Sequence, residues 1–502
     1  MTGTTGRADA RTLLAALSQR LSAAAGVLLD PDVVASVPQS PPRSRAAGLL
    51  PHLVRLCADP ARLDARWLVF TATFGAFPTA DELKDFGRFV ELARPEHAES
   101  GLLARVIADP ARGRVDLPMT VVDGGVVVDV DFCARHDTHT GIHRVVRETV
   151  PRWTAAHDVV PAAWIDEYSA FRTLAPREED RVLRFGRDTT PDPAADAAYA
   201  PRLVVPWRSV VVLPDVPNAE AGAELASLAR FSGNRLALIG YDMIPITSAE
   251  VRPASDAVGF AQYLTVVKHA HKVAGISRSA AAEFAGFAHA VAAQGLPGPV
   301  VREVQLAGEP PLAGARRSHT PSERPVLLCV GSREPHKNQR AALHAAERLW
   351  REGVELEVRL VGGPGFSDAV LRPAIDRILA AGYPLVDLGR VSDEVLTAEM
   401  TGADAVFFAS LHEGYGLPVA EALACGTPVI TSNFGSQLEI AEKGGCLVVD
   451  PRDDDDVTAA VRRLMTDRAE RERLRAQAAA RPVRTWDDYA ADLWDFVTEE
   501  SA

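Results

Sequence analysis

The run DAVFFASLHEGYGLPVAEALACGTPVI, at residues 404–430, holds the most specific pattern in this chain. It opens with an apolar stretch typical of a buried strand and continues into a loop that contains Gly414 and Gly416. A short helix is predicted to begin near Pro418 and to end at Gly426, before a second apolar strand. This order of strand, glycine loop, helix and strand predicts a parallel α/β unit.

The loop and helix of this segment combine features that suit a phosphate and a sugar. Glycine lets backbone N–H groups approach a phosphate closely, and the positive N-terminus of the helix adds to the attraction. Glu413 precedes Glu421 by eight positions, so the two carboxylates are expected to flank one ligand. Paired acceptors suit vicinal hydroxyls, which ribose and hexoses both carry.

The pattern of strand and helix extends outward from this segment through the second half of the chain. The strand-like runs are VLLCVG, VRLVGG, PLVDLGRV, DAVFFAS, TPVITSN and GCLVVD, with helical stretches between several of them. Continuous apolar strands alternating with helices predict a doubly wound parallel sheet, which we assign to residues 326–482. The preceding polar segment GARRSHTPSERP, residues 314–325, is interpreted as an interdomain linker.

The first half of the chain predicts a second α/β domain, at residues 119–313, behind a helical extension. Its strand-like runs are VVVDVDF (126–132), SVVVLPD (209–215), LALIGYD (236–242) and HKVAGIS (271–277). Two such sheets make a cleft, and ligands bind where the carboxyl ends of the strands meet it. Residues 1–118 are predicted to be mainly helical, with a capping box at Thr79 and Glu82. Partner docking, dimer contact and acceptor gating all fit this extension.

Composition narrows the class of protein. The 502 residues carry a formal net charge of -13, which disfavours nucleic acid as a partner. The five cysteines are odd in number and scattered, so we expect reduced thiols in a cytoplasmic protein. No segment approaches the roughly 20 apolar residues of a membrane-spanning helix. Peripheral contact with a membrane stays open.

The E-x7-E pattern inside EGYGLPVAEALACG resembles the signature loop of family 4 glycosyltransferases. The resemblance implies the GT-B fold, an α/β fold in which two Rossmann-like domains face each other across a cleft. It implies retaining transfer of a hexose-type sugar from a UDP- or GDP-sugar. Glu421 is then expected to bind the ribose hydroxyls and Glu413 to contact the transferred sugar as a catalytic residue. The donor-binding loop comprises Gly414, Tyr415, Gly416 and Leu417.

A second match is VLLCVGSREPHKNQRAAL at residues 326–343, which resembles the family's G-x-x-x-P-x-K-N segment. The resemblance implies that Lys337 holds the diphosphate and assists catalysis, since the leaving diphosphate gains charge in the transition state. Many relatives carry arginine where this chain has Ser332, so Ser332 and Arg333 are alternative contacts to the diphosphate. Gly389, Arg390 and Val391 correspond to the loop that holds the nucleobase.

Two segments of the first half also carry the resemblance. DTHTGIHRVVRETV, at residues 137–150, is similar to a T-G-I-x-R-V-V-R-E loop in one branch of the family and implies that Thr140 and Gly141 approach the donor phosphates. IGYDMIP, at residues 239–245, resembles H-D-x-x-P with Tyr241 in place of histidine. Asp242 either faces the acceptor or sugar as a catalytic residue or caps the following turn. In relatives the last helix, here within 483–502, crosses back onto the N-terminal domain.

The sequence also contains features of a metal site and is compatible with two other functions. Cys133, His136, His139 and His143 have the ligand types that zinc prefers, but they lie in a glycine loop, and the resemblance implies an enzyme without metal or other cofactor. A glycoside phosphorylase on the same fold and a non-catalytic sugar-nucleotide-binding scaffold are the rival functions. The retained Glu413, Lys337 and Glu421 weigh against the scaffold. The acceptor, whether a saccharide, a lipid-linked sugar or a small molecule, and the oligomeric state are left open.

Overall fold

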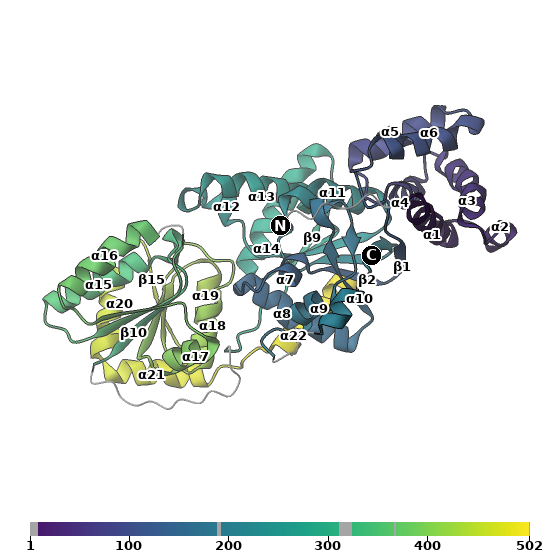
Figure 1. Ribbon diagram of the computed structural model, residues 1–502. Helices are drawn as coiled ribbons and strands as arrows, with labels where there is room; N and C mark the ends of the chain where they lie inside the picture. Colours follow the sequence, from purple (N-terminus) through teal and green to yellow (C-terminus); the bar gives the residue numbers. More distant parts are fainter. Residues whose placement is uncertain (1–8, 188–191, 311–323, 366–367, 501–502) are drawn as a thin grey trace.

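The computed structural model describes residues 9–187, 192–310, 324–365 and 368–500. It has two sheets, one of nine strands in the first half of the chain and one of six in the second. In Figure 1 the two sheets lie in separate lobes, with the second half of the chain forming one end of the molecule. Residues 314–323 of the predicted linker lie outside the described residues.

The second lobe is built on six parallel strands in the order β12-β11-β10-β13-β14-β15. All six strands predicted there are confirmed, and all are short apolar runs between helices. The strands are β10 (Val326–Val330), β11 (Glu357–Val361), β12 (Leu385–Gly389), β13 (Ala405–Phe408), β14 (Val429–Ser432) and β15 (Cys446–Val449). The helices are α15 (Gln339–Arg351), α16 (Asp368–Ala380), α17 (Asp393–Gly402), α18 (Leu417–Ala424), α19 (Gly435–Ala441), α20 (Asp454–Thr466) and α21 (Arg468–Ala479). A 3-10 turn, η5 (Pro335–Lys337), precedes α15.

The first lobe has a larger sheet, in the order β1-β5-β4-β3-β2-β6-β7-β8-β9. Only β4 runs antiparallel to its neighbours. The strands are β1 (Met119–Asp123), β2 (Val126–Asp129), β3 (Val159–Trp164), β4 (Phe171–Arg172), β5 (Leu203–Trp207), β6 (Val210–Leu213), β7 (Arg235–Gly240), β8 (Lys272–Gly275) and β9 (Val300–Glu303). The predicted runs correspond to β2, β6, β7 and β8. The others were not predicted, and two of them contain a proline, Pro161 in β3 and Pro206 in β5, which weakens a strand signal.

Helices cover this sheet. They are α7 (Asp131–Arg135), α8 (Gly141–Ala156), α9 (Pro176–Leu183), α10 (Pro193–Ala198), α11 (Gly222–Phe231), α12 (Ile244–Thr247), α13 (Ala254–Val267) and α14 (Arg278–Val291), with 3-10 turns η1 (Asp166–Tyr168), η2 (Ala219–Ala221), η3 (Ala249–Val251) and η4 (Ala292–Gln294). Two of them, α8 and α14, begin in loops that contact the second lobe.

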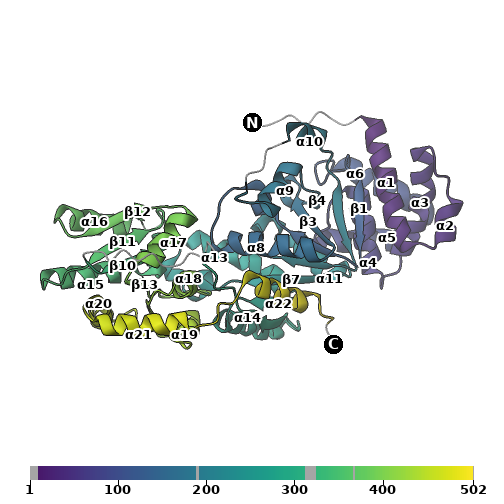
Figure 2. The same ribbon diagram turned by 90° about the horizontal axis from the view of Figure 1, so that it is seen from below.

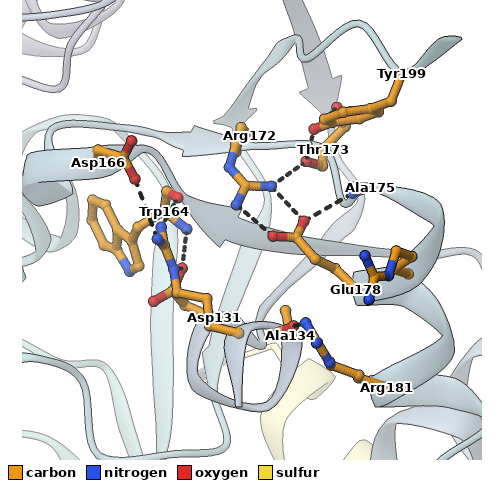
Figure 3. Close-up of polar contacts among 12 residues, drawn as sticks. Asp131, Ala134, Trp164, Asp166, Arg172, Thr173, Ala175, Glu178, Arg181 and Tyr199 are labelled. Atoms are coloured by element: carbon orange, nitrogen blue, oxygen red, sulfur yellow. Dashed lines mark hydrogen bonds and ion pairs between the residues drawn. The ribbon is translucent and has the colours of Figure 1, made fainter. Parts of the chain in front are cut away.

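A polar frame fixes the chain around α7 and α9 (Figure 3). Asp131 accepts a hydrogen bond from the backbone of Trp164 at 2.8 Å. Arg172 and Glu178 form a bidentate pair at 2.6 and 2.7 Å. Arg181 of α9 donates to the carbonyl of Ala134 at 3.2 Å. The frame supports the loop that leaves α7 and begins α8.

The N-terminal helices share a core with the first sheet. They are α1 (Ala10–Leu28), α2 (Pro31–Ser36), α3 (Pro42–Cys57), α4 (Leu63–Phe74), α5 (Ala80–Leu92) and α6 (Pro95–Ala108), and the capping box at Thr79 and Glu82 is confirmed. Gln19 of α1 exchanges two hydrogen bonds, of 2.8 and 2.7 Å, with the backbone of Met119 at the edge strand β1. The buried Arg20 donates to the carbonyls of Ala72 and Leu117, both at 2.7 Å. Figures 1 and 2 both place these helices at the end of the lobe away from the second sheet.

The last helix, α22 (Trp486–Thr498), packs on the first lobe after the chain leaves the second (Figure 2). Trp153 of α8 donates through its indole N–H to the carbonyl of Ala490 at 2.8 Å. Lys272 of β8 donates to the carbonyl of Phe496 at 2.7 Å. None of the described helices is long and apolar enough to cross a membrane.

Candidate active site

The candidate site lies where the second sheet changes the direction of its winding. Strands β10 and β13 are neighbours, but the chain proceeds from them toward opposite edges. Loops that leave such a point splay apart and open a ligand crevice at the carboxyl ends of the strands. The loop after β10 carries Lys337, and the loop after β13 carries Glu413. Their side chains meet, with Lys337 Nζ 2.6 Å from Glu413 Oε1.

Glu421, in the second turn of α18, contacts the other lobe. Its side chain is 5% exposed and forms an ion pair with Arg144 of α8. Arg144 also donates to the carbonyl of Glu309 at 3.2 Å. Burial raises the pKa of Glu421 to about 7, while the Arg144 guanidinium opposes that shift. The structure therefore brings Glu421 to the boundary between the lobes, with a cation from the first half of the chain beside it.

The glycine loop between Glu413 and α18 packs against the first lobe, and its sequence reflects that contact. A Cβ at Gly414 would lie 2.2 Å from the carbonyl oxygen of Tyr241, so no larger residue fits there. Ser277, the N-cap of α14, donates through its hydroxyl to the Gly414 carbonyl at 2.6 Å. Tyr415 is buried and donates to the Leu306 carbonyl at 3.1 Å. Gly416 has a φ of 102°, which favours glycine, and precedes α18.

The Thr140–Gly141 turn lies opposite this loop. Thr140 caps α8, with His143 completing the capping interaction. A Cβ at Gly141 would lie 3.5 Å from Leu417 Cδ1, so the start of α8 and the start of α18 approach each other across the boundary. The predicted residues Thr140, Gly141, Gly416 and Leu417 therefore lie in one place, although they come from opposite halves of the chain.

The two alternative contacts to the diphosphate differ in accessibility. Arg333 is 4% exposed and forms ion pairs with Asp368 at 2.5 Å and Asp387 at 2.6 Å. Ser332 is exposed at the carboxyl end of β10. Arg333 is therefore engaged inside its own domain, where it joins the loop after β10 to the start of α16 and to strand β12. Gly389 ends β12, Arg390 and Val391 follow it, and a Cβ at Gly363 would lie 3.6 Å from Arg390 Nε.

Asp242 follows β7 of the first lobe and both caps a turn and lies against the loop of the second. Its Oδ1 accepts a hydrogen bond from the backbone N–H of Ile244 at 3.0 Å. Its Cβ would lie 3.2 Å from a Cβ at Gly414. Burial raises the pKa of Asp242 to about 6, and the negative charges of Glu413 and Glu283 add to that effect. Tyr241 points the other way and donates to the Pro214 carbonyl at 2.6 Å.

Four further polar residues surround the site and were not assigned from the sequence. Arg144 pairs with Glu421, and its place in the T-G-I-x-R pattern was a usable signal. His412 lies 3.0 Å from Glu283 of α14, and this pairing raises the pKa of His412. His336 is 6% exposed, and its buried Nδ1 has no hydrogen-bond partner among the described residues. Nothing in a single sequence indicates that Glu283 approaches His412.

The thiol and imidazole groups near α7 do not assemble into a metal site. His143 caps α8, His139 stacks on Phe185, and Cys133 is buried, with burial raising its pKa to about 12. Among the residues of the ranges given above, no three His, Cys, Asp or Glu side chains are grouped to hold a metal ion. Whether the protein works without a metal stays a prediction.

Comparison with known proteins finds a family model and relatives that match the second lobe. A family model described as "Glycosyl transferases group 1" matches residues 315–481. O-antigen chain mannosyltransferase B of Escherichia coli is 34% identical over 32% of this chain and 42% of its own length. A GDP-mannose-dependent alpha-(1-6)-phosphatidylinositol monomannoside mannosyltransferase of Mycolicibacterium smegmatis is 28% identical over 55% of this chain and 71% of its own. The chain thus spans less than half the length of the first of these relatives.

Solved structures share the arrangement of both lobes. HepE of Anabaena, in complex with UDP and glucose, has a TM-score of 0.53 and 12% identity over 75% of this chain and 99% of its own. Sucrose-phosphate synthase of Thermosynechococcus elongatus has a TM-score of 0.52 and 17% identity over 74% and 98%. These likenesses confirm the predicted fold. The chain thus has the GT-B fold, and its residues 315–481 are similar to the glycosyl transferases group 1 family.

Proposed function

We propose that this protein is a retaining glycosyltransferase that moves a hexose-type sugar from a UDP- or GDP-sugar to an acceptor hydroxyl. One observation carries the proposal: Lys337 and Glu413 meet at the switch point between β10 and β13, and the following helix α18 carries Glu421 to Arg144, near the Thr140–Gly141 turn. The mannosyltransferases among the relatives support a hexose, and the name of one specifies GDP-mannose.

In the proposed reaction the bond between the anomeric carbon and the diphosphate oxygen breaks, and a bond from that carbon to the acceptor oxygen forms. The acceptor proton passes to the leaving diphosphate. Lys337 stabilises the charge that develops there, since its ammonium has three N–H donors and can bind Glu413 and a phosphate together. Glu413 orients the sugar, and Glu421 binds the ribose hydroxyls. Ser332, which is exposed, is placed better than Arg333 to contact the diphosphate.

The proposal is tested by incubating the protein with a panel of UDP- and GDP-sugars and measuring slow donor hydrolysis by mass spectrometry. Lys337→Ala is expected to reduce turnover by about 100-fold or more, because it removes a preorganised charge from the leaving group. Lys443→Ala, at an exposed lysine of the same domain, is the matched control.

Glu421→Gln tests the ribose assignment separately. Donor affinity should fall about tenfold or more, because hydrogen bonds to a charged carboxylate are stronger than those to an amide. Unchanged affinity in this variant would remove Glu421 from the ribose site. A folded protein that neither binds nor hydrolyses any donor of the panel would overturn the proposal as a whole.

A further inference from the structure

A cavity of about 440 Å³ opens at the carboxyl end of the first sheet, beside the site described above. It lies at the corresponding switch point of that sheet, between the loops after β2, β6 and β7. Helices α13 and α14 form its walls, and His336 of the second lobe reaches into its lining. Its volume is within the range of small-molecule sites, which is about 300–1,000 Å³.

The lining of this cavity is mainly apolar. Aromatic side chains come from Phe260, Tyr263 and Phe284, and aliphatic ones from Ile142, Val216 and Ile244. A pocket for a bare sugar would carry many hydrogen-bond groups, because each buried hydroxyl needs a partner. This lining instead offers an apolar surface with a few polar groups at one side, which suits a ligand with a hydrocarbon or aromatic body.

The charges in the lining disfavour an anion. The lining contains two acidic residues, Asp242 and Asp256. Arg252 donates two hydrogen bonds to Asp256, of 3.0 and 2.6 Å, and balances its charge. His336 is held neutral, since burial lowers its pKa to about 4. Among the described residues that line the cavity, the charges therefore sum to about one negative. A phosphorylated ligand would meet net repulsion there, because the charge of Arg252 is already balanced by Asp256.

The polar groups lie on the side that meets the candidate active site. His336 is next to Lys337 in the chain, and its Nδ1 is buried without a partner among the described residues. Asp242 touches the Gly414 loop, and only its Oδ1 is engaged by Ile244. A hydroxyl held between His336 and Asp242 would satisfy the imidazole nitrogen and lie beside the carboxylate of Glu413.

We infer that this cavity binds the acceptor and that the acceptor is an uncharged hydroxyl compound with an apolar body, not a phosphorylated sugar or polyol. The inference rests on the proposed glycosyltransferase function. The apolar body fills the space lined by Phe260, Tyr263 and Phe284, and the reacting hydroxyl lies at the Asp242 and His336 side.

The test is a binding measurement on the full chain with three probes that share one sugar: phenyl β-D-glucoside, methyl β-D-glucoside and glucose 6-phosphate. Ligand-observed NMR should show the phenyl glucoside binding at least tenfold more tightly than the methyl glucoside, with glucose 6-phosphate weakest. Equal affinity for the two glucosides, or tightest binding of glucose 6-phosphate, would overturn the inference.

A cavity-filling variant tests whether the probe binds in this cavity. Gly259 lies on α13 in the lining, and a Cβ there meets nothing within 4 Å, so Gly259→Leu should fill the space without a clash. Binding of phenyl β-D-glucoside should then fall at least tenfold, at an unchanged melting temperature. Gly286→Leu on α14, also with nothing within 4 Å but outside the lining, should bind as the wild type does.

Retained binding in Gly259→Leu contradicts the inference. Donor hydrolysis by the wild type is measured apart, so its failure counts against the proposed function alone.

Discussion

At the scale of single residues, the buried carboxyl of Asp215, after β6, lowers the stability of the folded state by an amount that depends on pH. Its Oδ1 accepts a hydrogen bond from Val216 N at 2.7 Å, while its buried Oδ2 has no hydrogen-bond partner among the described residues. Burial raises the pKa of Asp215 from 3.8 to about 6. The folded state therefore disfavours the ionised carboxylate more than the unfolded chain does, and stability is lost as pH rises between these two values.

Asp215→Asn keeps the accepting oxygen and removes the charge. Below about pH 4 the carboxyl is neutral in both states, so the variant and the wild type should be equally stable. Above pH 6 the variant should be more stable, by up to about 3 kcal/mol, since each unit of pKa shift corresponds to about 1.4 kcal/mol. Thermal unfolding of both proteins from pH 4 to 7.5 measures the difference. A difference that does not change with pH would contradict the account.

Gly414 is a residue at which the backbones of the two lobes pack closely. Gly414→Ala places a Cβ 2.2 Å from the Tyr241 carbonyl, so either the loop or the first lobe must move. Because Glu413 is next in the chain, we expect turnover to fall at least tenfold while each lobe keeps its melting temperature. Gly402→Ala at the end of α17 meets nothing within 4 Å and is the matched control. Wild-type turnover in Gly414→Ala would mean that the loop tolerates the shift.

At the scale of elements, α22 belongs to the first lobe in its packing although it follows the second in sequence. Leu493 of this helix is fully buried, in a cluster that includes Trp153 of α8. Leu493→Ala should lower the free energy of unfolding of the first lobe by about 2–5 kcal/mol, the usual cost of truncating a buried leucine. The matched control is Asp495→Ala on the exposed face of the same helix. Urea unfolding of both variants measures this loss, and equal midpoints would show that α22 contributes little to the stability of the first lobe.

The elements also show what a single sequence predicts well. The second sheet was predicted strand by strand, because its strands are short and mostly apolar and alternate with helices, and β10, β13 and β14 are fully buried. In the first sheet, β4 has only two residues and β9 is mostly exposed, so neither leaves a pattern to detect. The joining of the N-terminal helices to β1 through Gln19 was also not predictable, since one glutamine in a helix gives no signal of its distant partner.

At the scale of the whole molecule, several contacts between the lobes around the site are polar, beside a buried apolar cluster that also contains residues of both lobes. Besides the pair of Arg144 and Glu421, Arg278 of α14 forms an ion pair with Glu442 at 2.6 Å, and His412 pairs with Glu283. Such contacts exchange partners more readily than a packed apolar surface does, which suits a cleft that admits a ligand. The paired residues are far apart in sequence. Sequence patterns therefore indicated the residues in each half of the site, but not which residues pair across the lobes.

Replacing Arg144, which pairs with Glu421, tests whether both lobes bind the donor nucleotide. Arg333 is held by two aspartates, whereas Lys337 and Arg144 are cations paired with the predicted donor-binding residues Glu413 and Glu421. A guanidinium has five N–H donors and can bind Glu421 and a diphosphate oxygen together. We therefore expect Arg144→Met, which keeps the length of the side chain, to weaken UDP or GDP binding about tenfold, with the larger loss at low ionic strength. Arg152→Met, at a partly exposed pair on the same helix, should bind normally.

Calorimetric titration at two salt concentrations distinguishes the outcomes: tighter binding by Arg144→Met would show that Arg144 competes with the nucleotide for Glu421 instead of helping to hold it.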